Sequence, residues 1–127
     1  MKKFASFLVV AALVCGQAHA QWLNKQISNY PFVASDARAE QIRQGVPKIT
    51  KGMTLNQTRA VLGEADEVRA VMMTSPMTGL RVHTGYTFAY VVRRLAADGS
   101  REQKQEAVLR VWFDTNRRVS IVDHWGL

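Results

Sequence analysis

The sequence predicts an α+β fold in which two short N-terminal helices pack on one face of a three- to four-stranded antiparallel meander, giving a two-layer domain. Two segments between residues 35 and 63 combine helical periodicity with residues that cap helix ends. Beyond Gly63 the apolar residues recur with a period close to two, which is typical of strands. Polar segments separate these strands along the chain, so consecutive strands can pair as antiparallel neighbours.

Residues 1–20 have the pattern of a secretory signal peptide. Lys2 and Lys3 precede an apolar run from Phe4 to Val14, and Ala18 and Ala20 supply the small residues that a signal peptidase recognises. The run is shorter than the roughly 18 residues that indicate a membrane span. We therefore expect export, with cleavage after Ala20.

Cys15 is the only cysteine of the chain, and it lies inside this expected signal peptide. A lipoprotein signal has a small residue before its cysteine, whereas Val14 is large and β-branched. We therefore expect Cys15 to be discarded rather than lipidated. The exported chain would then have no disulfide and no thiolate metal site, which fits a bacterial periplasm.

The chain is basic, with a net charge of +7 that falls to +5 when Lys2 and Lys3 are lost with the signal peptide. A basic exported domain is drawn to anionic partners, which in a bacterial envelope are lipid head groups, lipopolysaccharide or acidic proteins. We do not expect nucleic acid as a partner, because the basic residues are scattered rather than clustered.

Residues 21–34 are expected to form an extended arm, because Pro31 interrupts any regular element there. Residues 35–127 are enough for a single domain with a modest core. Ser35 is a suitable N-cap for a first helix over Asp36–Gln44, and Gly45 favours its termination.

The segment Lys51–Gly63 predicts a second helix with both ends defined by the sequence. Thr54 is the expected N-cap, and Gln57 three residues later completes a capping box. Gly63 suits the left-handed residue that commonly ends a helix. The residues of this structural motif are Gly52, Met53, Thr54, Gln57, Leu62 and Gly63.

Three or four strands are expected after the second helix, the first of them being the optional one, and they are joined by a turn over Thr74–Gly79, a polar loop over Ala96–Glu106 and a tight turn over Asp114–Arg117. The expected strands are Glu67–Met73, Leu80–Leu95, Ala107–Phe113 and Val119–Asp123. The residues expected to face the helices are Phe88, Tyr90, Val92, Leu109, Val111, Phe113, Val119 and Ile121.

The opposite face of the sheet is the candidate binding surface for a partner or a lipid. The residues expected there are Val91, Arg93, Arg110, Trp112 and Val122. An exposed tryptophan beside arginines is apolar enough to bind and basic enough to select an anionic partner. The alternative is that the arm over residues 21–34 covers this face and the arginines are merely solvated. The pattern favours neither alternative.

The order of these elements resembles the SmpA/OmlA (BamE-like) family of outer-membrane assembly proteins. The residues that carry the resemblance lie between about Gln44 and Val122 and are Gly52-Met53-Thr54, Leu62-Gly63, Phe88, Tyr90 and Leu109–Asp114. The resemblance implies a small periplasmic domain at the inner face of the outer membrane. It also implies a non-enzymatic accessory of the barrel assembly machinery, with contact to anionic phospholipid.

The chain departs from that family in two respects. It lacks the lipidation signal that is usual for members of the assembly machine. It also reads Glu64-Ala65-Asp66 where the family commonly has a proline shortly after the Leu-Gly pair. Both departures fit a non-lipidated paralogue, which could have a different partner.

The sequence offers no good catalytic or metal-binding set. Asp123 and His124 are adjacent, so their side chains would diverge on a strand, and neither Ser75 nor Ser120 has the context of a nucleophile. Two histidines without clustered carboxylates make a poor metal site. We therefore expect no enzyme, no cofactor and no small-molecule substrate. The expected function is that of an envelope-assembly accessory, and the alternative is a soluble periplasmic inhibitor or binding module for an exported enzyme.

Overall fold

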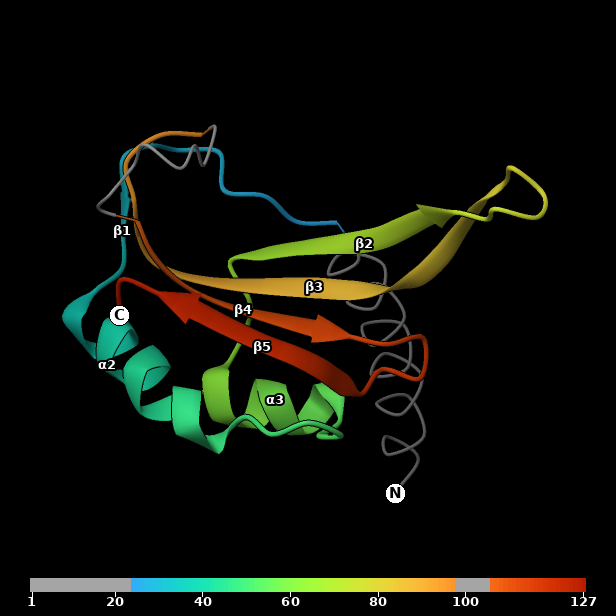
Figure 1. Ribbon diagram of the computed structural model, residues 1–127. Helices are drawn as coiled ribbons and strands as arrows, with labels where there is room; N and C mark the ends of the chain where they lie inside the picture. The colour runs from blue at the N-terminus through green and yellow to red at the C-terminus, as the bar shows by residue number, and fades with distance from the viewer. Residues whose placement is uncertain (1–23, 98–105) are drawn as a thin grey trace, which may run out of the picture.

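The structure is a computed structural model that describes residues 24–97 and 106–127. Within these residues it is an α+β fold with two α-helices and a five-stranded antiparallel sheet (Figure 1). The elements are β1 (Phe32–Val33), α2 (Asp36–Gly45), the 3₁₀ turn η1 (Val46–Lys48), α3 (Leu55–Leu62), β2 (Glu67–Thr74), β3 (Arg81–Arg94), β4 (Ala107–Phe113) and β5 (Val119–Trp125). The α+β class is confirmed, and the short strand β1 is additional to the strands expected from the sequence.

Strand β3 is the centre of the sheet. It pairs with β4 along one edge, while β2 and β1 share its other edge, and β5 pairs with β4 on the outside. The ladder is interrupted by bulges after Val71, between Val91 and Arg93, and between Trp112 and Phe113. Each bulge changes which side chains point to which face beyond it, because side chains alternate strictly along an unbroken strand.

The expected signal peptide and most of the loop over Ala96–Glu106 lie outside the described residues. The turn expected over Thr74–Gly79 is present, and it is closed by the Ser75 amide, which donates to the Leu80 carbonyl at 2.8 Å. Strands β2 and β3 continue beyond the body of the domain, so this turn is the end of a projecting hairpin (Figure 1).

Helix α2 begins as expected, with the Ser35 hydroxyl accepting from the Arg38 amide at 3.2 Å. Its end differs from the expectation, because Gly45 has a helical φ of −73° and continues into η1 rather than terminating the helix. A Cβ atom at Gly45 would lie 2.3 Å from the Leu62 side chain. The glycine is therefore used for the close approach of α2 to α3, not for a left-handed stop.

Helix α3 has the capping box that the sequence predicts. The Thr54 hydroxyl accepts from the Gln57 amide at 3.1 Å, and the Gln57 side chain accepts from the Thr54 amide at 2.9 Å. Gly52 and Gly63 have φ values of 89° and 74°, a region that glycine adopts without steric cost. The Gly52 amide also donates to the carbonyl of Val119 at 2.8 Å, so the start of this motif is bonded to the edge of the sheet.

The main core lies between the helices and one face of the sheet, and α2 and α3 occupy the same side of the ribbon (Figure 1). Its sheet residues are Val68, Phe88, Tyr90, Val92, Ala107, Leu109, Val111, Phe113 and Val119, and its helix residues are Ala39, Ile42, Leu55 and Leu62. The alternation of β3 and β4 thus places the apolar residues as expected. Ile121 is the exception, since its side chain is 57% exposed.

Candidate binding face of the sheet

The sheet face opposite the helices is divided between a half covered by the N-terminal arm and an open half. Ile27 and Phe32 of the arm pack on Ala89, Val91 and Val108, which form a second, smaller apolar cluster. Val91 is fully buried there. For this half of the face, the alternative in which the arm covers the sheet is therefore the correct one.

Backbone hydrogen bonds attach the arm to the edge of β2. The amide of Lys25 donates to the carbonyl of Val68 at 3.1 Å, and the amide of Val68 donates back to Lys25 at 2.9 Å. The Lys25 ammonium group also donates to the Ala65 carbonyl at 2.9 Å. The arm thus acts as a short extra strand at this point and is bonded to the outer side of the sheet.

A buried ion-pair cluster lies beneath the arm. The Arg94 guanidinium donates to Glu67 at 2.6 Å and to Glu106 at 3.1 Å, and all three side chains are less than a tenth exposed. The other Glu67 oxygen accepts from the Ile27 amide at 3.3 Å. Burial opposes the charge of Arg94, but hydrogen bonds with Glu67, Tyr30 and Glu106 outweigh burial and raise its pKa above the usual value. Arg94 therefore stays charged, and its hydrogen bonds link the arm to β2 and β3.

Asp66 is a second partly buried carboxylate, just before β2. It accepts from the Val91 amide at 2.7 Å, next to the bulge in β3. Burial raises the pKa of Asp66, although the hydrogen bond from Val91 and the charges of Arg38 and Lys25 act in the opposite direction. The role of Asp66 is structural, because it satisfies a β3 amide that lies just beyond the point where β2 begins its pairing, at Glu67 and Ala89.

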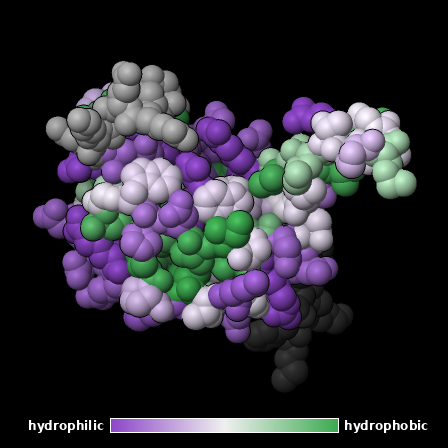
Figure 2. All heavy atoms as spheres, viewed as in Figure 1, coloured by the Kyte–Doolittle hydropathy of each residue, from purple (hydrophilic) through white to green (hydrophobic). Residues whose placement is uncertain are grey.

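The open half of the face consists of Arg110, Trp112, Ile121, Asp123 and Trp125, from β4 and β5. The Arg110 guanidinium lies 5.6 Å from the Trp112 ring centre and 5.2 Å from the Trp125 ring centre. Both distances are within the range of a cation–π contact. Asp123 is opposite Arg110 in the strand register, so the surface combines two indoles, one cation and one carboxylate. Figure 2 shows that the surface over β5 is apolar and has hydrophilic surroundings.

Two of the five expected surface residues, Arg110 and Trp112, meet in this open half. Arg93 does not, because the bulge after Val91 shifts the alternation and places Arg93 opposite Ala107, a residue of the main core. Arg94 takes the position on the arm side instead. The expectation for Arg93 is therefore wrong, and the reason is a bulge that strict alternation cannot anticipate.

The expectation for Val122 is also wrong. Val122 lies opposite Val111 and packs against the main core, whereas Ile121 lies opposite Trp112 on the open half. A bulge at Ser120 exchanges the two faces of β5, and the Ser120 hydroxyl donates to the Trp112 carbonyl at 3.2 Å. The same bulge explains why Ile121 is exposed rather than buried.

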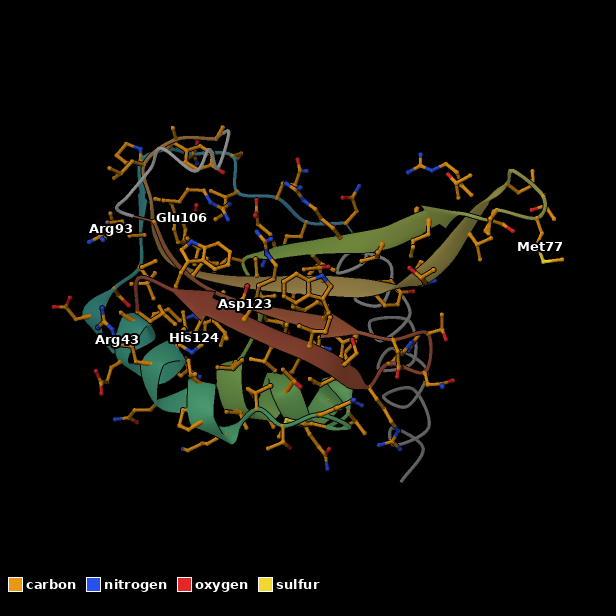
Figure 3. The ribbon with its side chains drawn as sticks, viewed as in Figure 1. Arg43, Met77, Arg93, Glu106, Asp123 and His124 are labelled. Atoms are coloured by element: carbon orange, nitrogen blue, oxygen red, sulfur yellow. The ribbon has the colours of Figure 1, made fainter. Side chains whose placement is uncertain are left out.

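Trp125 is the functional candidate that the sequence analysis missed. The last strand is expected to end at Asp123, whereas β5 continues to Trp125, which pairs with Val108 and is 36% exposed. The signal that could have identified it is the continued alternation of Ile121, Asp123 and Trp125, which becomes apparent once the bulge is known. Asp123 and His124 point to opposite sides of β5 (Figure 3), so they do not form a catalytic pair.

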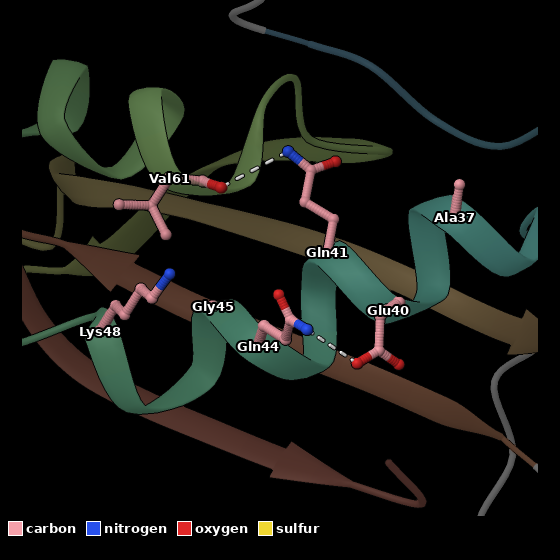
Figure 4. A pocket seen from close by; sticks show the side chains of 7 residues that line it. All are labelled: Ala37, Glu40, Gln41, Gln44, Gly45, Lys48 and Val61. Carbon is pink, nitrogen blue, oxygen red and sulfur yellow. Dashed lines mark hydrogen bonds between the residues drawn. The ribbon is translucent and has the colours of Figure 1, made fainter.

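A hollow of about 310 Å³ lies between α2 and α3 (Figure 4). It is lined by Ala37, Glu40, Gln41, Gln44, Gly45, Lys48 and Val61. Two of its glutamines make hydrogen bonds: Gln44 donates to Glu40 at 3.0 Å, and Gln41 donates to the Val61 carbonyl at 3.4 Å. No serine, threonine, cysteine or histidine is among the residues that line this hollow.

Among the described residues, no group of three histidine, cysteine, aspartate or glutamate side chains is close enough to hold a metal ion. In the same part of the chain, none of the helices has the length and apolar character needed to cross a bilayer. Comparison with known proteins gave no match to a family model, a curated protein or a solved structure. The resemblance to the SmpA/OmlA family therefore stays a prediction.

Proposed function

We propose that the chain is a non-enzymatic accessory of outer-membrane assembly that is exported to the periplasm and binds an acidic protein partner through the open half of its sheet. The observation that carries this proposal is the placement of Arg110 between the indoles of Trp112 and Trp125. The family resemblance supplies the envelope context, and the BamE-like arrangement of helices and sheet belongs to the same proposal.

The arrangement suits binding for a physical reason. Cation–π contacts at exposed sites contribute about 0.5–1 kcal/mol each, so the two indoles hold the Arg110 side chain in place before a partner arrives. A guanidinium that is already ordered loses less entropy when it donates to a carboxylate in a bidentate contact. Tryptophan and arginine are also the residues most often found to dominate binding energy at interfaces.

Affinity capture from detergent-solubilised envelopes tests this proposal. The chain is expected to capture barrel-assembly proteins, and Trp112→Ala is expected to weaken the capture at least about tenfold, as for an interface hot spot. Glu40→Gln, an exposed change on α2, is the matched control and is expected to have no effect. Circular dichroism should show that Trp112→Ala leaves the fold nearly unchanged, because the indole is not part of either apolar cluster.

Two outcomes would count against the proposal. If Trp112→Ala captures the assembly proteins as well as the unchanged chain does, the open half is not part of the interface. Capture of a single exported enzyme instead of assembly proteins would favour the alternative function, that of a periplasmic binding module or inhibitor.

A further inference from the structure

The hairpin of β2 and β3 carries an apolar patch at its outer end. The patch, called the tip patch below, comprises Met72, Met73, Met77, Leu80 and Val82, whose exposed fractions run from 40% to 94%. Figure 2 shows this end of the hairpin standing clear of the body, and Figure 3 places Met77 at its extremity. None of these side chains belongs to either apolar cluster of the domain, so core packing does not explain them.

The tip patch surrounds the hairpin rather than lying on one side of it. Met73 pairs with Val82, so these two side chains share one face of the hairpin. Met72 pairs with His83 and points to the other face, because neighbouring residues of a strand alternate. Met77 lies in the turn and Leu80 directly follows it, and they are 94% and 67% exposed. Apolar atoms are thus exposed on both faces and at the end.

The charge of the hairpin is of one sign. Residues 69–83 include Arg69 and Arg81 but no aspartate or glutamate. Both arginines are exposed, and Arg81 pairs with Thr74 at the base of the turn. The nearest carboxylate along the chain, Glu67, is buried in its contact with Arg94. The hairpin therefore combines an apolar end with positive charge that no carboxylate of its own balances.

We propose that this hairpin docks the protein on a membrane surface that contains anionic lipid, with the tip patch in the acyl region and Arg81 at the depth of the phosphates. A protein surface would ordinarily engage one face of a hairpin, whereas a bilayer surrounds an inserted element on all sides, as the tip patch requires. The stretch from Met73 to the turn spans roughly 10 Å at the rise of a strand, which matches the depth of interfacial insertion. The long arginine side chain can keep its charge in the head-group layer while its stem is buried.

This inference deepens the proposed envelope function and rests on it for the membrane that the protein would meet. It separates two contacts that the sequence analysis placed on one surface. The open half of the sheet binds the protein partner, and the hairpin binds the lipid.

Flotation with vesicles tests the inference directly. The probes are vesicles of phosphatidylcholine alone and vesicles with a quarter of phosphatidylglycerol. The full chain is expected to float with the anionic vesicles, and Met77→Ser combined with Leu80→Ser is expected to reduce the partition coefficient at least about tenfold. Arg81→Gln is expected to reduce it about fivefold on anionic vesicles and to have no effect on neutral ones.

Matched variants isolate the hairpin. Met77→Leu combined with Leu80→Met keeps the end apolar and is expected to float like the unchanged chain. Ile121→Ser removes an apolar side chain that is 57% exposed from the open half and is expected to leave flotation intact. Every variant shares the same N-terminus, verified by intact mass, so a difference in flotation reports on the substituted residues. The thermal midpoint of the double serine variant should be unchanged, because both side chains are already in solvent.

The inference is overturned if the unchanged chain does not float, or if the double serine variant floats equally well. It is also overturned if Ile121→Ser reduces flotation as strongly, since the sheet face would then be the lipid contact. Loss of partner capture by the double serine variant, with no flotation of the unchanged chain, would assign the hairpin to a protein groove instead. Trp112→Ala distinguishes partner binding by the open half from lipid binding by the hairpin, because this variant should fail to capture the partner but should still float with anionic vesicles.

Discussion

Replacement of Arg94 by methionine is expected to destabilise the domain by about 3–5 kcal/mol, the usual cost of removing one partner from a buried ion pair. Methionine preserves much of the side-chain volume, so the main effect is electrostatic. Glu67 and Glu106 would remain beneath the arm, each less than a tenth exposed, without the cation that both contact. For a domain of this size, such a loss lowers the melting temperature by more than about 10 °C.

Urea unfolding followed by circular dichroism measures this loss. The exposed pair of Arg59 and Glu64 provides the control, because its side chains are 34% and 63% exposed. Glu64→Gln is expected to cost less than about 1 kcal/mol, as is typical of surface ion pairs.

A deficit below about 1 kcal/mol at pH 7 would refute the reasoning, since it would mean that water reaches the cluster.

Two further substitutions test buried polar groups. The Tyr90 hydroxyl is buried and has no hydrogen-bond partner among the described residues. Tyr90→Phe is therefore expected to raise the free energy of unfolding by about 1 kcal/mol. A lower free energy of unfolding would show that the hydroxyl has a partner. Burial raises the pKa of Asp66, so folding favours the protonated carboxyl group. The stability that this group adds is fully present below the usual pKa of 3.8 and is lost as the pH rises through the raised pKa. Asp66→Asn keeps an acceptor for the Val91 amide and is therefore expected to increase the melting temperature at pH 7 but not at pH 3. A lower melting temperature at pH 7 would show that the charged hydrogen bond outweighs burial.

The parts of the fold that the sequence predicts well are those fixed by local interactions. Thr54 and Gln57 define the start of α3 through two hydrogen bonds that involve only neighbouring residues. Alternation along β3 correctly places Phe88 and Tyr90 in the core because no bulge separates them. In such segments the periodicity of side chains and the capping residues are sufficient.

The errors at the candidate site have a common physical cause. The bulges near Val91 and Ser120 have no glycine or proline to indicate them, and each exchanges the two faces of the strand beyond it. Strict alternation therefore predicts the wrong face for Arg93, Val122 and Ile121. The cover over Val91 depends on contacts with Ile27 and Phe32, which are remote in sequence and leave no periodic signal.

The backbone contacts of the arm and of the α3 motif have a consequence for self-association. An exposed sheet edge can recruit strands from other molecules, which is a common route to aggregation. Here the Val68 amide and carbonyl are occupied by Lys25, and those of Val119 are occupied by Gly52 and Met53. β2 and β5 are thus each blocked near their start by pieces of the same chain, so strand addition that includes Val68 or Val119 would first have to displace native hydrogen bonds.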